Sequence, residues 1–217
     1  MKQFGLKWSF FLTGLVILGC GIAMTFKGSW YGVSSWDVLH YGLYTQLGLT
    51  VGSWSILVGL SIIISTWLIT KKAPQVGAYI NMLTVGMFID LFLWILPETT
   101  SFLWQSVYYF GGVVVIGAGI GLYVSGGVGA GPRDHLMLWL SERTGWSVAK
   151  TRGLMEIVVL FIGYLLGGPV GIGTFILAFG LGPCIQLSLK LAKKLFQWIE
   201  VKLILKAVPE VTNNTCM

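Results

Sequence analysis

Residues 32–51 read GVSSWDVLHYGLYTQLGLTV, and residues 129–148 read GAGPRDHLMLWLSERTGWSV. At a shift of 97 positions, a window of this size is expected to give roughly two identical pairs from composition alone. It gives six, and one is an aspartate in a chain with only 8 Asp and Glu residues. The sequence therefore predicts an internal repeat. The identical pairs are Gly32/Gly129, Asp37/Asp134, Leu39/Leu136, Leu43/Leu140, Gly48/Gly145 and Val51/Val148.

The composition indicates a helical protein that crosses a membrane several times. Of the 217 residues, 55% are hydrophobic and 10% are charged, and the mean hydropathy is +0.82. These values exclude an ordinary soluble domain. Segments at membrane depth must satisfy their own backbone hydrogen bonds, so all-α structure is expected. The predicted spans are Trp8–Phe26, Val51–Thr70, Val76–Pro97, Phe102–Val124, Gly153–Gly168 and Val170–Leu189.

The positive charge of the chain predicts its orientation. The net charge of +6 is interpreted as membrane orientation, because Lys and Arg concentrate in cytoplasmic loops, and no nucleic-acid partner is expected. With six spans, every basic cluster falls on the side of Lys2 and Lys7. If the segments around Asp37 and Asp134 also crossed, Lys71 and its neighbour would emerge on the opposite side. Six spans with both termini in the cytoplasm are therefore predicted, in a cell membrane.

The two amphipathic segments, about Ser35–Leu47 and Pro132–Thr144, are then re-entrant or interfacial helices. Each repeat unit holds three spans, an odd number, so the second unit enters the membrane from the opposite side. This predicts an inverted repeat, as in many secondary transporters. The predicted units are residues 1–99 and 100–198, followed by a basic, partly disordered cytoplasmic tail at 199–217.

The repeated aspartates are the first candidates for a binding site. Asp37 and Asp134 each fall in the first turn of a predicted helix, where a carboxylate interacts favourably with free N–H groups. The same position suits a ligand or a coupling ion, and the two roles are compatible. His40 lies on the polar face of the first helix with Asp37. Arg133, beside Asp134, is explained by orientation or by an anionic substrate or lipid headgroup.

Two further acidic residues belong to predicted spans. Asp90 is the sole charge within Val76–Pro97, and an ionisable group in a span is a functional hypothesis by default. Its place about two turns before Pro97 also allows contact with the outer interface. Glu156 follows Arg152 by four residues, so it is explained by an i, i+4 ion pair or as a buried proton carrier.

Glycines suggest how the spans pack. Gly19 and Gly21, and their counterparts Gly117 and Gly119, allow helices to approach closely. In the sixth span, small residues and a proline predict an interruption of the helix, of the kind that lines transporter sites; plain packing is the alternative. These residues are Gly173, Thr174, Gly182 and Pro183.

Motifs for enzymatic chemistry are absent from the sequence. It has no Gly-x-Ser-x-Gly, no phosphate-binding loop and no His/Cys metal set. Its three cysteines, Cys20, Cys184 and Cys216, form no paired framework. We therefore expect no enzyme, no cofactor and no metal.

The chain resembles the YczE/YyaS/YitT-like bacterial integral membrane proteins up to about Trp198. The shared features are the segments Trp36-Asp37-Val38-Leu39 and Pro132-Arg133-Asp134-His135-Leu136, and the small residues of the sixth span at 171–174 and 182–183. The resemblance implies a bacterial cytoplasmic membrane, and the family supplies no established substrate.

Two functional hypotheses stay open. The first is a small secondary transporter or exporter of a small solute, with a site near Asp37, Asp134 and Asp90 and with a substrate or coupling ion as ligand. The second is a non-transporting accessory or regulatory protein that supports a biosynthetic or export complex. Besides the lipid bilayer, a protein partner or a homodimer is compatible with either hypothesis.

Overall fold

A computed structural model describes residues 2–71, 75–129 and 131–205, and these residues fold entirely into helices and their connections. Five helices are long and apolar enough to cross a membrane: Gln3–Lys27, Val51–Thr70, Val76–Ile95, Phe102–Gly126 and Ile172–Lys202. The helices are α1 (Lys2–Lys27), a short 3₁₀ helix η1 (Ser29–Tyr31), α2 (Ser35–Leu47), α3 (Val51–Thr70), α4 (Val76–Ile95), α5 (Phe102–Gly126), α6 (Pro132–Thr144), α7 (Val148–Leu165) and α8 (Ile172–Leu205).

The two halves of the chain follow the same order of helices. A long helix, a short helix and two further helices make up α1–α4, and the same order recurs in α5–α8. The short helices α2 and α6 have 13 residues each, and their bounds differ by the 97 positions of the sequence repeat. Both end at a glycine with positive φ, Gly48 (74°) and Gly145 (71°). Glycine is favoured there because it has no Cβ to clash in this conformation.

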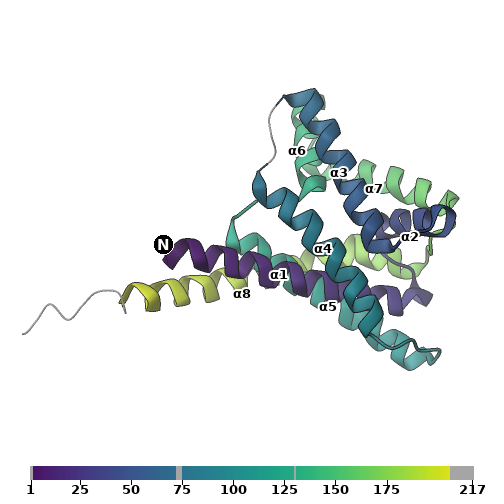
Figure 1. Cartoon of the computed structure of the whole chain (residues 1–217), viewed down its shortest axis with the longest axis horizontal. Coiled ribbons are helices and arrows are strands. Elements are labelled where there is room, and N and C mark those ends of the chain that lie inside the picture. Colours follow the sequence, from purple (N-terminus) through teal and green to yellow (C-terminus); the bar gives the residue numbers. More distant parts are fainter. Residues whose placement is uncertain (1, 72–74, 130, 206–217) are drawn as a thin grey trace, which may run out of the picture.

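The centre of the fold is the antiparallel contact of α1 with α5 (Figure 1). The backbones are so close that a Cβ on Gly21 would lie 2.6 Å from the Ile116 nitrogen, and one on Gly119 would lie 2.6 Å from the Leu18 nitrogen. No side chain fits at either position. These two glycines therefore have the packing role predicted for them. Small residues at a contact between membrane helices let the backbones approach closely.

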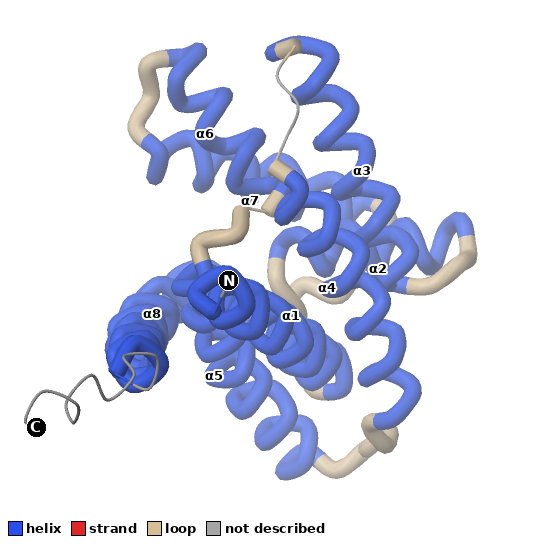
Figure 2. Tube along the Cα trace, turned by 60° about the vertical axis from the view of Figure 1, so that its left-hand side comes forward, coloured by secondary structure: helices blue, strands red, loops and turns tan. Residues whose placement is uncertain are grey.

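The remaining helices pack differently in the two halves. α4 lies on α1, where Gly19 contacts Phe88, and α8 lies on α5, where Gly117 contacts Cys184. α3 packs along α4, but α7 packs on α2 and α6 and has no comparable contact with α8. In Figure 2, α8 lies beside α5 at the lower left, and α7 lies above α1, next to α6.

The ends of the long helices show which elements share a side. The Gln3 side chain donates to Glu200 near the end of α8, so the beginning of α1 and the end of α8 lie together. At the opposite end of α1, Lys27 pairs with Glu98, which follows α4. The first and last described helices therefore begin and end on the same side of the molecule.

α8 corrects one prediction about the sixth span. The predicted interruption at Gly182 and Pro183 is absent, because α8 runs as one helix through Pro183. A proline removes a single N–H donor, and the regular turns on both sides keep this helix continuous. Gly171 precedes the helix, whereas Gly173 packs against the Tyr109 ring. Residues 199–205 of the predicted tail continue α8, and the rest of that tail, with the disorder predicted after Pro209, lies outside the described residues.

Candidate functional site

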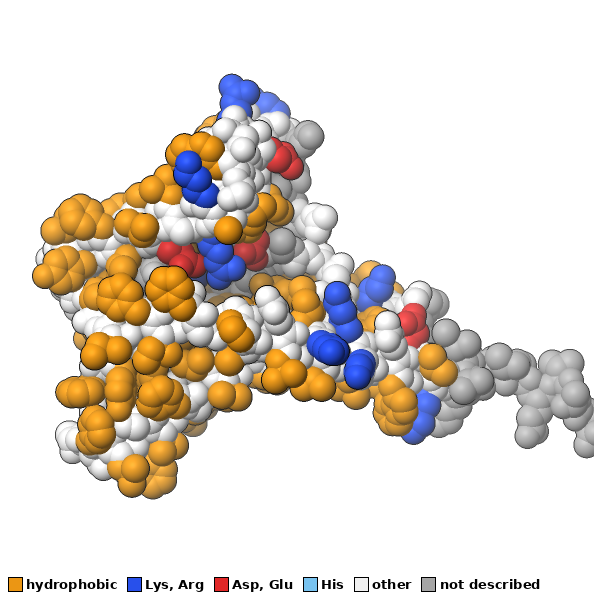
Figure 3. All heavy atoms as spheres, turned by 180° about the vertical axis from the view of Figure 1, so that it is seen from behind, with side chains coloured by type: hydrophobic (Ala, Val, Ile, Leu, Met, Phe, Trp, Pro, Cys, Tyr) orange, Lys and Arg blue, Asp and Glu red, His pale blue; other side chains and the backbone are white. Residues whose placement is uncertain are grey.

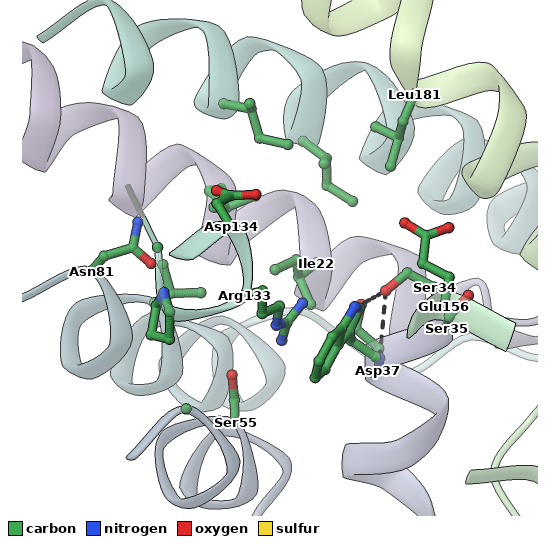
Figure 4. Close-up of a pocket in the computed structure, with 18 of the residues that line it drawn as sticks. Ile22, Ser34, Ser35, Asp37, Ser55, Asn81, Arg133, Asp134, Glu156 and Leu181 are labelled. Carbon is green, nitrogen blue, oxygen red and sulfur yellow. Dashed lines mark hydrogen bonds between the residues drawn. The ribbon is translucent and has the colours of Figure 1, made fainter. Parts of the chain in front are cut away.

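A cavity of about 220 Å³ lies between the two halves and is lined by residues from all of α1 to α8. Figure 3 shows the hollow from one face of the molecule, with acidic and basic side chains gathered in it. Figure 4 shows the lining side chains, with Arg133 among them. The volume suits a small solute or a cluster of water molecules, since drug-sized ligands occupy pockets of about 300–1,000 Å³.

The beginnings of two short helices meet this cavity. Ser35 and Asp37 from α2, and Pro132 and Asp134 from α6, are among its lining residues. The first turn of a helix has free N–H groups and the positive end of the helix dipole. The cavity therefore receives two such ends from opposite halves of the chain.

The start of α2 is capped by a side chain, although Asp37 Oδ1 is buried and has no hydrogen-bond partner among the described residues. The Ser34 hydroxyl accepts from the Asp37 backbone N–H at 3.4 Å and donates to the Asp37 carboxylate. Asp37 is 3% exposed. Burial raises the pKa of Asp37, but His40, Arg133 and Ser34 together hold that pKa below its ordinary value. Asp37 therefore lines the cavity as an ionised carboxylate that accepts from the hydroxyl of the N-cap residue, Ser34.

His40 lies behind Asp37 and outside the cavity lining. It is 0% exposed, and its Nδ1 is 3.5 Å from Asp37 Oδ1. Neither ring nitrogen makes a hydrogen bond to any described residue. Burial lowers the pKa of His40, although the neighbouring carboxylate opposes this effect. The neutral His40 ring therefore contacts Asp37 on the side away from the cavity and does not line the cavity. The side chain of the other histidine, His135, lies outside the described residues.

The start of α6 differs from that of α2. Its N-cap is Gly131, which has no side chain to bond the first turn, and Pro132 occupies the first helical position. The next two residues, Arg133 and Asp134, form no ion pair within 4 Å among the described residues. The Asp134 carboxylate accepts a hydrogen bond from the backbone of Gly131. The Arg133 guanidinium carbon lies 4.6 Å from the centroid of the Trp36 ring on α2, a cation–π contact.

Asp134 has a different electrostatic environment from Asp37. Burial raises the pKa of Asp134 above its ordinary value, and the positive charges of Arg152 and Arg133 only partly oppose this effect. Among the described side chains, no His or Ser stabilises its ionised form in the way that Ser34 and His40 stabilise Asp37; the backbone of Gly131 donates to it instead. The two repeated aspartates are therefore chemically unequal.

α7 contributes an ion pair to the cavity lining. Arg152 Nε lies 3.0 Å from Glu156 Oε1, as the i, i+4 interpretation of the sequence predicted. Both residues also line the cavity. Glu156 therefore both pairs with Arg152 and lines the cavity.

Polar residues of α3 and α4 complete the lining. Ser55 and Asn81 are each 9% exposed and border the cavity, and their side chains make no hydrogen bond to a described residue. Neither was singled out as a site residue from the sequence. The repeat relates Ser55 to Arg152, because the two residues are 97 positions apart. This relation is the signal in the sequence that could have identified Ser55.

Asp90 is not brought together with the other candidates. Its carboxylate accepts from the Gly52 backbone N–H at 2.8 Å and from the Thr50 hydroxyl at 2.5 Å. It therefore fixes the beginning of α3 and does not line the cavity. Thr174 likewise has a structural contact: it is buried, and its hydroxyl accepts from the Gly171 N–H at 3.3 Å.

Comparison with known proteins identifies the family. A family of unknown function, DUF6198, matches residues 5–190. The chain belongs to the DUF6198 family. Among similar proteins, the uncharacterized membrane protein YczE of Bacillus subtilis is 45% identical over 190 residues, covering 87% of this chain and 88% of YczE. YyaS of the same organism is 32% identical, covering 79% of this chain and 86% of YyaS.

An uncharacterized protein of Haemophilus influenzae is 31% identical, covering 86% of this chain and 85% of that protein. No solved structure matches the chain. The resemblance to YczE and YyaS expected from the sequence is thus confirmed, and this DUF6198 protein is an integral membrane protein.

Proposed function

We propose that this protein is a small secondary transporter of the bacterial cytoplasmic membrane, and that its central cavity binds the solute between two inverted three-span units. The observation that carries the proposal is the pairing of the lining residues. Many of the lining residues form pairs that occupy equivalent positions in the two repeat units. The members of a pair are 97 positions apart, or 98 for residues of α1 and α5. These pairs are Leu18/Ile116, Ile22/Ile120, Ser34/Gly131, Ser35/Pro132, Trp36/Arg133, Asp37/Asp134, Ser55/Arg152, Gly59/Glu156 and Asn81/Ala178.

The contact of α1 with α5 supports an inverted relation of the units. A Cβ on Gly14 would lie 2.8 Å from the Gly119 oxygen, and one on Gly21 would lie 3.1 Å from the Gly112 oxygen. At a shift of 98 positions, Gly14 corresponds to Gly112 and Gly21 to Gly119. Each contact is therefore the counterpart of the other, which is the pattern that a two-fold axis between antiparallel helices produces.

We propose α7 as the sixth span. It has 18 residues and carries Lys150, Arg152 and Glu156, which distinguishes it from the five more apolar helices. Two of these charges pair with each other at the cavity, as charged residues in membrane helices usually do. With six spans, α2 and α6 enter from opposite sides without crossing, and both termini are cytoplasmic.

The two halves differ in a way that supports alternating access. In the first half, α3 and α4 are tightly packed: a Cβ on Gly52 would lie 2.1 Å from the Gly86 oxygen, and one on Gly59 would lie 2.7 Å from the Met82 side chain. Their counterparts α7 and α8 are apart. We propose that exchange of these two arrangements, with α7 closing on α8 and α3 parting from α4, moves access from one side of the cavity to the other.

Purified protein in liposomes tests the proposal. A panel of small solutes is screened first for thermal stabilisation of the protein and then, as labelled compounds, for uptake. We expect at least one solute to stabilise the protein and to accumulate in the vesicles. If no solute does either, while crosslinking in cells recovers a stable protein partner, the accessory function is correct and the transporter proposal fails.

The orientation has its own test, with single cysteines in a background that lacks Cys20, Cys184 and Cys216. In intact cells, a membrane-impermeant maleimide should label a Thr100→Cys variant and leave Lys71→Cys and Arg143→Cys unlabelled until the cells are opened. External labelling of Lys71→Cys would overturn the six-span arrangement.

A further inference from the structure

The charges that line the cavity fall into a paired set and an unpaired set. Arg152 and Glu156 neutralise each other at 3.0 Å, and Asp37 is held by Ser34 and His40. Two others are consecutive on α6: Arg133, whose guanidinium lies over the Trp36 ring, and Asp134, which accepts from the Gly131 backbone. With His40 neutral, Asp37 has no opposite charge within 4 Å either, but it accepts from the Ser34 hydroxyl, whereas no described side chain bonds Arg133 or Asp134.

The backbone beside Arg133 is also available. Side chains bond the first turns of three neighbouring helices: Ser34 accepts from Asp37, Thr50 from Ser53 and Ser147 from Lys150. The first turn of α6 has no such side-chain bond. An unbonded helix start beside a guanidinium is suited to a carboxylate, which can accept from both.

Buried polar side chains with no partner give independent evidence for a ligand. Ser35, Ser55 and Asn81 are 7%, 9% and 9% exposed, line the cavity and make no side-chain hydrogen bond to a described residue. Polar side chains in largely buried residues are normally hydrogen-bonded, and the cavity is the space from which a ligand can bond these three. They come from α2, α3 and α4, so three elements besides α6 direct unused hydrogen-bonding groups toward the same space (Figure 4).

We propose that the solute is a small zwitterion with a carboxylate and an ammonium group on neighbouring carbons, as in a small neutral amino acid. This inference rests on the proposed transport function. The carboxylate binds Arg133 and the first turn of α6. The ammonium group binds Asp134, and the buried hydroxyl and amide groups complete its hydrogen bonds. The cavity of about 220 Å³ limits the side chain of the solute to a few atoms.

The binding experiment compares solutes that differ by one charged group. Glycine, alanine and serine carry both groups, acetate and lactate lack the ammonium, and ethylamine lacks the carboxylate. Binding is measured on purified protein by thermal shift and by calorimetry. We expect the zwitterions to bind at least tenfold more tightly than either singly charged class, because each charge-assisted hydrogen bond contributes about that much.

Two variants and a matched control connect binding to the residues. Arg133→Gln and Asp134→Asn should each weaken zwitterion binding at least tenfold. The exposed Arg143→Gln, at the far end of α6, should leave it unchanged. If acetate or lactate binds as well as alanine and Asp134→Asn does not affect alanine, the solute is a simple anion and the inference is wrong.

Uptake measurements separate this inference from the transport proposal. Zwitterion binding without accumulation in liposomes would contradict transport and leave the site intact. Accumulation of a different solute class without zwitterion binding would overturn the site chemistry and leave transport intact.

Discussion

The Arg133 guanidinium carbon lies 4.6 Å from the centre of the Trp36 ring, and these two residues hold the same position in the two repeated segments, 97 residues apart. In the two-fold arrangement that we propose, counterparts contact each other only near the axis. Under that proposal the axis passes between the beginnings of α2 and α6. The contact also joins an aromatic ring from one half to a cation from the other. The two residues therefore hold equivalent positions but differ in chemical type.

Replacing Trp36 should weaken solute binding through Arg133. A Trp36→Leu variant removes the ring on which the guanidinium rests, and a cation–π contact contributes about 0.5–2 kcal/mol. We expect a loss of binding of about twofold to thirtyfold, measured by calorimetry. Trp36→Phe retains a ring and should lose less; equal losses in the two variants would contradict the role of the ring.

The contact of α1 with α5 should be the most sensitive packing site. A Gly119→Leu variant introduces a side chain where even a Cβ would lie 2.6 Å from the Leu18 backbone nitrogen. Overpacking of this kind costs about 1–3 kcal/mol or more, so the midpoint of thermal unfolding in detergent should fall clearly. Gly5→Leu is the control, because no atom lies within 4 Å of a Cβ at Gly5.

Asp90 should affect stability without affecting affinity. Asp90→Ala removes the acceptor for Gly52 and Thr50 at the start of α3. Loss of these hydrogen bonds to a charged group should lower the free energy of unfolding by about 1.5–3 kcal/mol. The binding constant of the folded protein for its solute should stay the same, because Asp90 does not line the cavity. A large change in affinity at unchanged stability would place Asp90 in the site.

Asp134 predicts a pH dependence of stability. Burial raises its pKa above the ordinary value of 3.8, so the folded state binds more protons than the unfolded state just above that pH. The contribution of Asp134 to stability is therefore present at low pH and is lost as the pH rises from 3.8 through the raised pKa.

Chemical unfolding at a series of pH values measures this dependence. Asp134→Asn should remove that part of the slope, whereas Glu142→Gln, at an exposed position on the same helix, should retain it. A slope that is the same in wild type and Asp134→Asn would contradict the role assigned to Asp134.

The separation of α7 from α8 predicts that a crosslink between these two helices should lock one conformation and stop transport. In a background without Cys20, Cys184 and Cys216, a Met155→Cys/Leu181→Cys pair connects one cavity-lining residue of each helix. Closure of α7 on α8 should let the pair crosslink, and the bond should stop uptake until a reductant is added. The matched pair Gly59→Cys/Met82→Cys, between the packed helices α3 and α4, should crosslink readily in the conformation described. Unimpeded uptake by both crosslinked proteins would contradict alternating access.

Local signals in the sequence were enough to predict several elements to the residue. The bounds predicted for Ser35–Leu47, Val51–Thr70 and Pro132–Thr144 are those of α2, α3 and α6. Each begins after a capping residue or with a proline, and both short helices end at a glycine with positive φ. Such signals act within one turn of helix, so they can be read without knowledge of the fold. α8 shows the limit of these local signals. Its proline predicted an interruption of the helix, but the helix continues through that residue.

The sequence by itself thus determined the membrane class, the helices and the position of the repeated aspartates near helix starts. Only the tertiary structure decided which of these residues share a site. It placed Asp134 and Arg133 at the cavity without an ion pair within 4 Å among the described residues, His40 behind Asp37, and Asp90 at the start of α3. The physical reason is that capping and hydropathy are local, whereas charge pairing depends on contacts between helices distant in sequence. Close approach at glycines such as Gly21 and Gly119 sets those contacts.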